Sequence, residues 1–155
     1  MWTKLNFGKH AGRTLPQVVL SDPNWFFWAA KNILYGRLAT EAEALERRAR
    51  NIKIPKPSPE KWEIEYRRDR DDRFLGFDFV KAKSHVHSPL FGRLPYLDLA
   101  YVRRGNIRDI RDCRLVIRDF RRLYFDGSNL TKQRCEEFFD NERNFTKPGR
   151  GSVFN

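Results

Sequence analysis

A row of arginines on one face of an expected helix is the first group of residues that could bind a ligand. The helix is expected over residues 104–124, and the arginines lie opposite its apolar side. They are Arg104, Arg108, Arg111, Arg114, Arg118, Arg121 and Arg122, of which the first two belong only if the helix begins early. Like charges on one face repel each other, so an anionic partner would stabilise the row. We expect phosphate binding; the alternative is a solvated face that acidic groups elsewhere neutralise.

A glycine turn near the N-terminus is the second candidate site. Gly8 and Gly12 surround a basic tip that carries Lys9, His10 and Arg13. Such a turn exposes backbone N–H groups which, beside positive charge, can hold a phosphate. The spacing GxxxxGK[ST] is absent, so the turn is not a Walker loop. The alternative is a structural turn over a small core.

Two histidines offer the strongest arrangement that suggests an enzyme. A weaker one is a partial metal-nuclease pattern of Glu63, Glu65, Asp78 and Lys81, but charged residues alternate on most exposed strands. On a strand, His85 and His87 would share one face and could hold a divalent metal, as in HUH endonucleases that nick single strands. The pair stands in a polar stretch before Pro89, and Tyr124 has no lysine in the register expected of a helical nucleophile. We therefore expect two surface residues in a loop, no catalytic residue, no bound metal and no cofactor.

The N-terminal third must position the glycine turn. A short hairpin is expected around the turn, followed by two helices, with Asp22 and Pro23 at the start of the first. The apolar residues of the first helix are Trp25, Trp28, Ala29 and Ile33, and those of the second are Leu38, Ala42, Leu45, Ala49 and Ile52. These elements would form a module over residues 1–53.

The remainder must position the arginine row. Three prolines in residues 54–60 predict a stiff linker, followed by a unit over residues 61–148 and a flexible tail over 149–155. Apolar runs predict strands at 62–66, 74–80 and 94–102, and helices follow at 104–124 and 131–143. Cys113 and Cys135 fall on apolar helix faces, where buried thiols are expected. The expected fold is α+β: the hairpin-plus-helices module, the linker, then an antiparallel sheet packed with two helices.

Composition favours an anionic partner. The chain has 155 residues, 31 Lys and Arg against 20 Asp and Glu, and a net charge of +11. Arginine outnumbers lysine, and its planar guanidinium suits phosphate. Apolar residues make up 40%, enough for a buried core, and no run of eighteen apolar residues predicts a membrane span. The N-terminus shows no apolar signal region, so a cytoplasmic protein is expected.

Two short motifs resemble a known family. The motifs FGKxxGRxL, at residues 7–15, and DPxWxxWA, at 22–29, are similar to the small C-terminal accessory module of exodeoxyribonuclease X-like proteins. The resemblance covers residues 1–52 and implies an accessory nucleic-acid-binding module without catalysis. It implies that Lys9, His10 and Arg13 lie at the tip and that Trp25 and Trp28 pack beneath them. Residues 60–155 resemble no family.

These observations predict a non-enzymatic nucleic-acid-binding protein of bacterial or phage origin, with DNA favoured over RNA. Binding would be through phosphate, because no base-reading motif is found. One alternative is a phage-encoded interaction protein with an anti-defence role, docking on a nucleoprotein complex of the host. A second is a metal-dependent nuclease or HUH-type nickase that uses His85 and His87.

Overall fold

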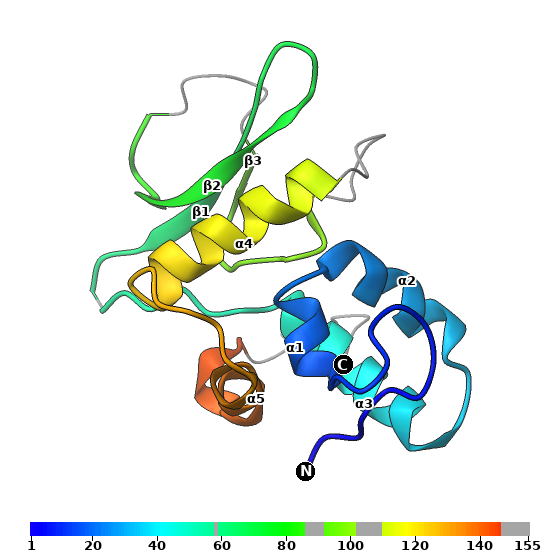
Figure 1. Cartoon of the computed structure of the whole chain (residues 1–155). Coiled ribbons are helices and arrows are strands. Elements are labelled where there is room, and N and C mark those ends of the chain that lie inside the picture. The colour runs from blue at the N-terminus through cyan, green and yellow to red at the C-terminus, as the bar shows by residue number, and fades with distance from the viewer. Residues whose placement is uncertain (58, 86–91, 102–109, 147–155) are drawn as a thin grey trace.

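The computed structural model describes residues 1–57, 59–85, 92–101 and 110–146. A group of helices forms one half of the molecule, and a three-stranded sheet with one long helix forms the other (Figure 1). The expected α+β class is confirmed. Arg104, Arg108, His87 and residues 149–155 lie outside the described residues, as does the side chain of Arg111.

The N-terminal turn is a small hairpin, as expected. Lys4 and Thr14 form an antiparallel bridge, and the Leu5 N–H donates to the Arg13 carbonyl at 2.8 Å. Gly8 and Gly12 have φ values of +73° and +88°, which side chains disfavour. A Cβ on Gly8 would also lie 3.1 Å from the Trp25 ring, so the absence of a side chain allows the turn to pack closely against that ring.

Three helices follow the turn: α1 (Leu15–Val19), α2 (Pro23–Asn32) and α3 (Gly36–Ala49). The expected buried face of α3 is confirmed by Ala42, Leu45 and Ala49. For α2 the expected face is confirmed in part: Ala29 is buried, and Trp25 and Ile33 pack against the core, but Trp28 is 50% exposed. Phe26 and Phe27, which were not expected on that face, are fully buried. This helix is apolar on nearly all sides, so spacing alone cannot select the face that is buried.

The sheet is antiparallel with the order β2-β1-β3, formed by β1 (Trp62–Arg68), β2 (Phe74–Lys81) and β3 (Gly92–Leu94). The first two strands match the expectation. The expected third strand at 94–102 is wrong, because β3 ends where that run begins. Leu97 instead exchanges backbone hydrogen bonds with Ile52 at 2.8 and 2.9 Å, which ties the segment after β3 to the end of α3.

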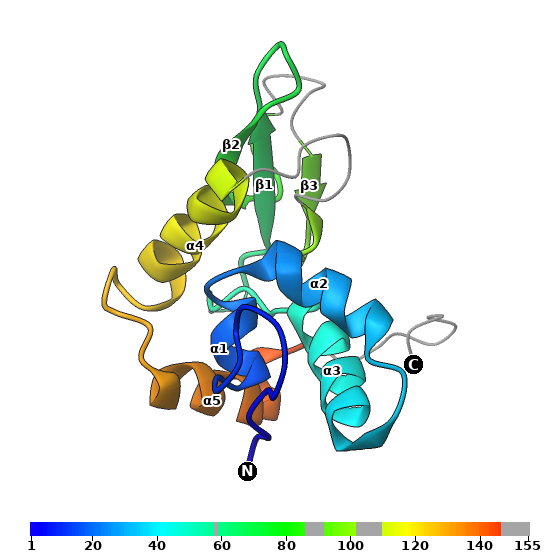
Figure 2. The same ribbon diagram turned by 45° about the vertical axis from the view of Figure 1, so that its right-hand side comes forward.

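Two further helices complete the fold, α4 (Ile110–Tyr124) and α5 (Lys132–Asp140), before the 3-10 turn η2 (Glu142–Asn144). Figure 2 shows α4 alongside β2, at the edge of the sheet, while α5 lies with the N-terminal helices. Only α4 therefore packs against the sheet as expected; α5 packs against α1. Periodicity identified the buried Cys135 and Phe139 of α5 but not the surface they would contact.

Residues from both halves share one hydrophobic core. Val18 and Leu45 of the helical half belong to the same cluster as Ile64 and Phe120 of the sheet half. No helix in the described ranges is long and apolar enough to cross a membrane.

Candidate nucleic-acid interface

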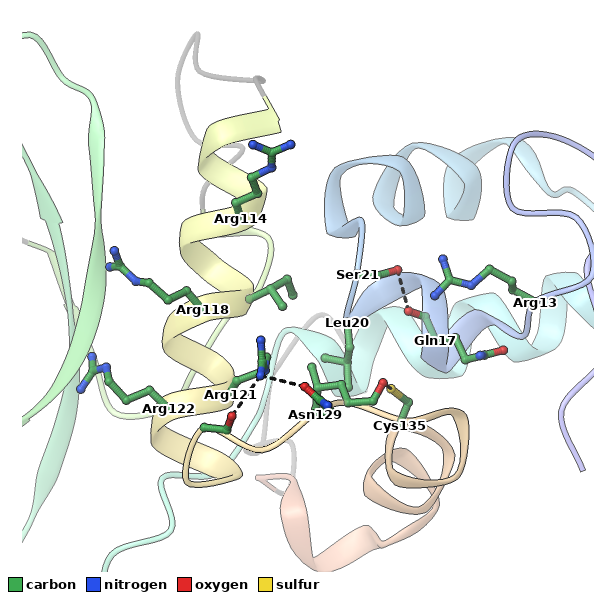
Figure 3. A pocket seen from close by; sticks show the side chains of 13 residues that line it. Arg13, Gln17, Leu20, Ser21, Arg114, Arg118, Arg121, Arg122, Asn129 and Cys135 are labelled. Carbon is green, nitrogen blue, oxygen red and sulfur yellow. Dashed lines mark hydrogen bonds between the residues drawn. The ribbon is translucent and has the colours of Figure 1, made fainter.

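A cleft of about 740 Å³ lies between α1 and α4 (Figure 3). The turn before α1 and the end of α1 form one wall, α4 forms the other, and the loop from α4 to α5 closes one end. The lining residues are Arg13, Gln17, Leu20, Ser21, Arg114, Ile117, Arg118, Arg121, Arg122, Gly127, Asn129, Leu130 and Cys135. Five of these are arginines and none is acidic. The cleft therefore brings together Arg13 of the N-terminal turn and four members of the arginine row.

Two of the five arginines turn their charged ends away from the cleft, toward β2 (Figure 3). The Arg118 guanidinium donates to both oxygens of Asp119 at 3.1 Å and to the Leu75 carbonyl at 3.5 Å. The Arg122 guanidinium donates to the Phe77 carbonyl at 3.2 Å and lies 3.6 Å from the Asp78 carboxylate. The aliphatic parts of these two side chains thus line the cleft, while their guanidinium groups lie at the edge of the sheet. Arg118 and Arg122 remain 58% and 49% exposed but are neutralised by carboxylates, which agrees with the alternative of a solvated, neutralised face for these two members of the row.

A third arginine, Arg121, holds the loop at the end of the cleft. Its guanidinium donates to the carbonyls of Gly127 and Ser128 at 3.0 and 3.2 Å, and to the Asn129 side chain at 3.2 Å. A cation here also opposes the negative end of the α4 dipole. Arg121 therefore combines positive charge in the cleft with a structural role in the loop.

The remaining two arginines have the most capacity for a ligand. Arg114 is exposed and makes no hydrogen bond or ion pair with any residue that the structure describes. Arg13 points toward the cleft from the opposite wall, and its guanidinium Nη1 lies 3.4 Å from His10 Nδ1. The nearby Glu136 carboxylate already accepts a hydrogen bond from Thr14 Oγ1 at 2.7 Å. Arg13 and Arg114 are thus the guanidinium groups best placed to receive a phosphate.

The tip of the glycine turn is arranged around Asp22. Lys9 Nζ and His10 Nε2 both lie 2.9 Å from Asp22 Oδ2, and the Trp25 N–H donates to Oδ1 at 3.3 Å. Burial raises the pKa of Asp22, but the hydrogen bonds from His10, Lys9 and Trp25 outweigh it, so the pKa lies below its ordinary value. The expected exposure of His10 at the tip is wrong, because its side chain is only 12% exposed and meets the Trp25 ring edge-on. Lys9 remains largely exposed.

The floor of the cleft is apolar. Leu20 and Ile117 line it beside the Cys135 thiol. Burial raises the pKa of Cys135 to about 11, although the charge of Arg13 acts in the opposite direction. The expected burial of both thiols is confirmed, and Cys113, also buried, lies outside the lining. The cleft therefore combines a cationic rim with an apolar floor and has no reactive thiolate.

The residues considered for metal chemistry are arranged differently. Of the histidine pair, His85 is exposed, and its carbonyl accepts from Arg93, whereas His87 lies outside the described residues. The strand carboxylates Glu65 and Asp78 each lie beside an arginine, Arg93 at 2.9 Å and Arg122 at 3.6 Å. Within the described ranges, no three His, Cys, Asp or Glu side chains are grouped as metal ligands would be.

Sequence reasoning identified the arginines of the cleft but treated them as two sites. Arg13 and Arg114 were expected on separate surfaces joined by the proline linker, and the structure places both on one cleft. The polar residues Gln17, Ser21 and Asn129 were missed, since three different elements supply them and no local motif marks them.

Comparison of the chain with protein-family models, curated proteins and solved structures finds no match.

Proposed function

We propose that this protein binds nucleic acid, DNA in preference to RNA, by holding backbone phosphates in the arginine-lined cleft between α1 and α4. The observation that carries the proposal is the lining of the cleft, in which Arg13, Arg114 and Arg121 present their charge and no residue is acidic. Arg13 and Arg114 supply the direct phosphate contacts, and Arg121 adds charge at the closed end. The preference for DNA rests on the resemblance of residues 1–52 to the exonuclease accessory module.

Electrostatics supports this proposal over a simple solvated surface. The chain carries a net charge of +11, so many of its cations have no carboxylate partner. Arg118 and Arg122 are not among these, because both are paired with carboxylates at the sheet edge. Arg114 has no such partner among the described residues, although Asp112 and Asp119 lie on the same helix and are both buried. Arg114 on one wall and Arg13 on the other would each gain from a phosphate held in the cleft.

The same geometry supports contacts with phosphate rather than with base edges. On α4, the exposed Arg118 and Arg122 are held by carboxylates and backbone carbonyls at the edge of β2, while Arg114 and Arg121 line the cleft. These basic side chains are placed for phosphates and not for insertion into a major groove. Phosphate contacts fix register and carry no direct sequence information. Binding is therefore proposed to be steeply dependent on salt and largely independent of sequence.

One binding series tests the proposal with the full chain. Fluorescence anisotropy is measured with a labelled DNA duplex, a single strand of equal length and the matching RNA, at several salt concentrations. The same samples are run on a denaturing gel after incubation with Mg²⁺ or Mn²⁺. We expect retention of DNA without cleavage, and an affinity that falls linearly with salt on a log–log plot.

Each other outcome of the series points elsewhere. No binding to any nucleic acid would overturn the proposal and favour the protein-partner alternative. Cleavage with Mn²⁺ that disappears in the His85→Ala, His87→Ala double variant would assign a nickase. Tighter binding to RNA than to DNA would overturn the stated preference.

A further inference from the structure

An aromatic cluster lies on the surface beside the glycine turn, outside the cleft. The ring centroid of Trp25 lies 6.2 Å from that of Phe7 and 6.0 Å from that of Trp28. Trp28 is 50% exposed and Phe7 is 39% exposed, whereas the neighbouring Phe26 and Phe27 are fully buried. Large aromatic side chains are usually well buried. The exposed rings of Phe7 and Trp28 on either side of Trp25 therefore form an apolar surface patch outside the core.

The surroundings of the cluster are basic. Lys9 Nζ is largely exposed at the tip of the same turn, and Lys31 is exposed one helical turn after Trp28. The Asp22 carboxylate nearby is already engaged by Lys9 and His10. Because Asp22 offsets the charge of Lys9, the net positive charge beside the cluster comes from Lys31. An occupant with flat apolar groups and negative charge fits this surface.

The cluster also continues from the cleft through a short series of contacts. Arg13 Nη1 lies 3.4 Å from His10 Nδ1, and the His10 and Trp25 ring centroids are 4.9 Å apart. Arg13 and Trp25 thus both contact His10, which is itself only 12% exposed, so a strand whose phosphate rests on Arg13 lies one side chain away from Trp25. Unpaired bases are flat, apolar on both faces and joined by phosphates, which matches this sequence of contacts.

We infer that Phe7, Trp25 and Trp28 form a stacking surface for unpaired bases, so that the protein recognises single-stranded nucleic acid or a single-stranded extension of a duplex. This inference rests on the proposed function and adds a preference for the unpaired form. Stacking on aromatic side chains tolerates any base, because every base presents a π face. Base pairs in a duplex do not offer their faces, so the cluster contributes nothing to duplex binding.

The test compares Trp28→Ala with wild type on oligo(dT) and on a duplex of equal length. Affinity for oligo(dT) is expected to fall by about fivefold or more, and affinity for the duplex by less than about twofold. Trp28→Phe keeps a stacking ring and is expected to recover most of the loss. Tyr35→Ala is the matched control, because Tyr35 is 86% exposed and lies outside the cluster. Oligo(dT) should also quench tryptophan fluorescence of the wild type more than the duplex does.

The outcomes separate this inference from the proposed function. If oligo(dT) and duplex bind wild type while Trp28→Ala changes neither, or weakens both equally, the stacking surface is overturned and the cleft stands. If nothing binds, both are overturned. A wild-type dimer that dissociates in Trp28→Ala would assign the cluster to a second copy of the chain and overturn the inference. Circular dichroism of each variant checks that the fold is retained.

Discussion

The Asp119 carboxylate on α4 accepts a hydrogen bond from the backbone N–H of Phe77 on β2, at 3.0 Å. Among the described strands, β2 has a neighbour on one side only, and the Phe77 N–H donates to Asp119 in place of a second neighbouring strand. The adjacent Arg118 and Arg122 donate to the Leu75 and Phe77 carbonyls of the same edge. α4 thereby satisfies with side chains the backbone groups that an open edge would offer to another strand.

Removing the Asp119 carboxylate should destabilise this junction. The Asp119 side chain is only 3% exposed, so Asp119→Ala leaves the Phe77 N–H buried without an acceptor. The substitution also removes the carboxylate that Arg118 and Arg122 share. We expect a loss of about 1–3 kcal/mol in the free energy of unfolding, measured by urea denaturation. Asp119→Asn keeps an acceptor oxygen and should lose less. Equal stability of Asp119→Ala and wild type would show that the edge contact contributes nothing.

Gly76 lies at the same junction and should not tolerate a side chain. Its φ is +128°, and a Cβ there would collide with Asp119 Oδ2 and lie 2.9 Å from Arg118 Nη2. Gly76→Ala should therefore cost about 1–3 kcal/mol in the free energy of unfolding through strain and displacement of Asp119. Gly127→Ala is the matched control, since Gly127 has a φ of +79° but open space around it. If both variants lose the same stability, strain at positive φ accounts for the effect without a clash.

The sequence predicted correctly those elements in which the spacing of apolar residues allows only one buried face. In α3, Ala42, Leu45 and Ala49 repeat on one face while charged residues fill the others, so the buried side was evident. The run after Pro95 also alternates, yet Leu97 pairs with Ile52, 45 residues earlier, and not with a neighbouring strand. Periodicity reports which residues are buried; it does not report which distant segment buries them.

The candidate site was predictable in composition and not in geometry. Arg118 and Arg122 looked equivalent to Arg114 on a helical wheel, but the acceptors at Leu75 and Phe77 come from a strand that no helix pattern can place. Arg13 and Arg114 are about a hundred residues apart in sequence, and only the packing of α1 beside α4 makes them opposite walls of one cleft. Those long-range contacts decide which arginines remain available to a ligand.

The charge of Asp22 should make stability depend on pH. Because its pKa is lowered below the ordinary 3.8, the folded chain favours the ionised carboxyl, and this stabilisation is present above that value. It is lost as pH falls through the lowered folded-state pKa. Asp22→Asn keeps a side-chain acceptor for the Trp25 N–H. We expect it to lose about 0.5–1 kcal/mol at pH 7, with the difference from wild type closing below about pH 4. A constant difference down to pH 3 would contradict a role for the charge.

The two buried thiols should react slowly in the native protein. Burial raises the pKa of Cys135 to about 11 and also raises that of Cys113, so little thiolate is present at pH 8. We expect labelling by a thiol reagent to be at least about a hundredfold slower in buffer than in denaturant, where both thiols become free. Fast labelling of one thiol in the native protein would mean that its helix opens readily.

The cleft arginines should govern the salt dependence of binding. Each phosphate neutralised by a cation releases counterions, so losing one contact reduces the log–log slope by about 0.9 for duplex DNA. The Arg13→Gln, Arg114→Gln double variant should therefore flatten the slope by about 2 units and leave the unfolding midpoint unchanged, since neither guanidinium supports the sheet edge. The Arg70→Gln, Arg73→Gln double variant removes two charges from exposed positions in the β1–β2 turn and is the matched control. A slope that falls equally in this control would indicate binding by overall charge, and an unchanged slope in the Arg13→Gln, Arg114→Gln variant would remove the cleft from the interface.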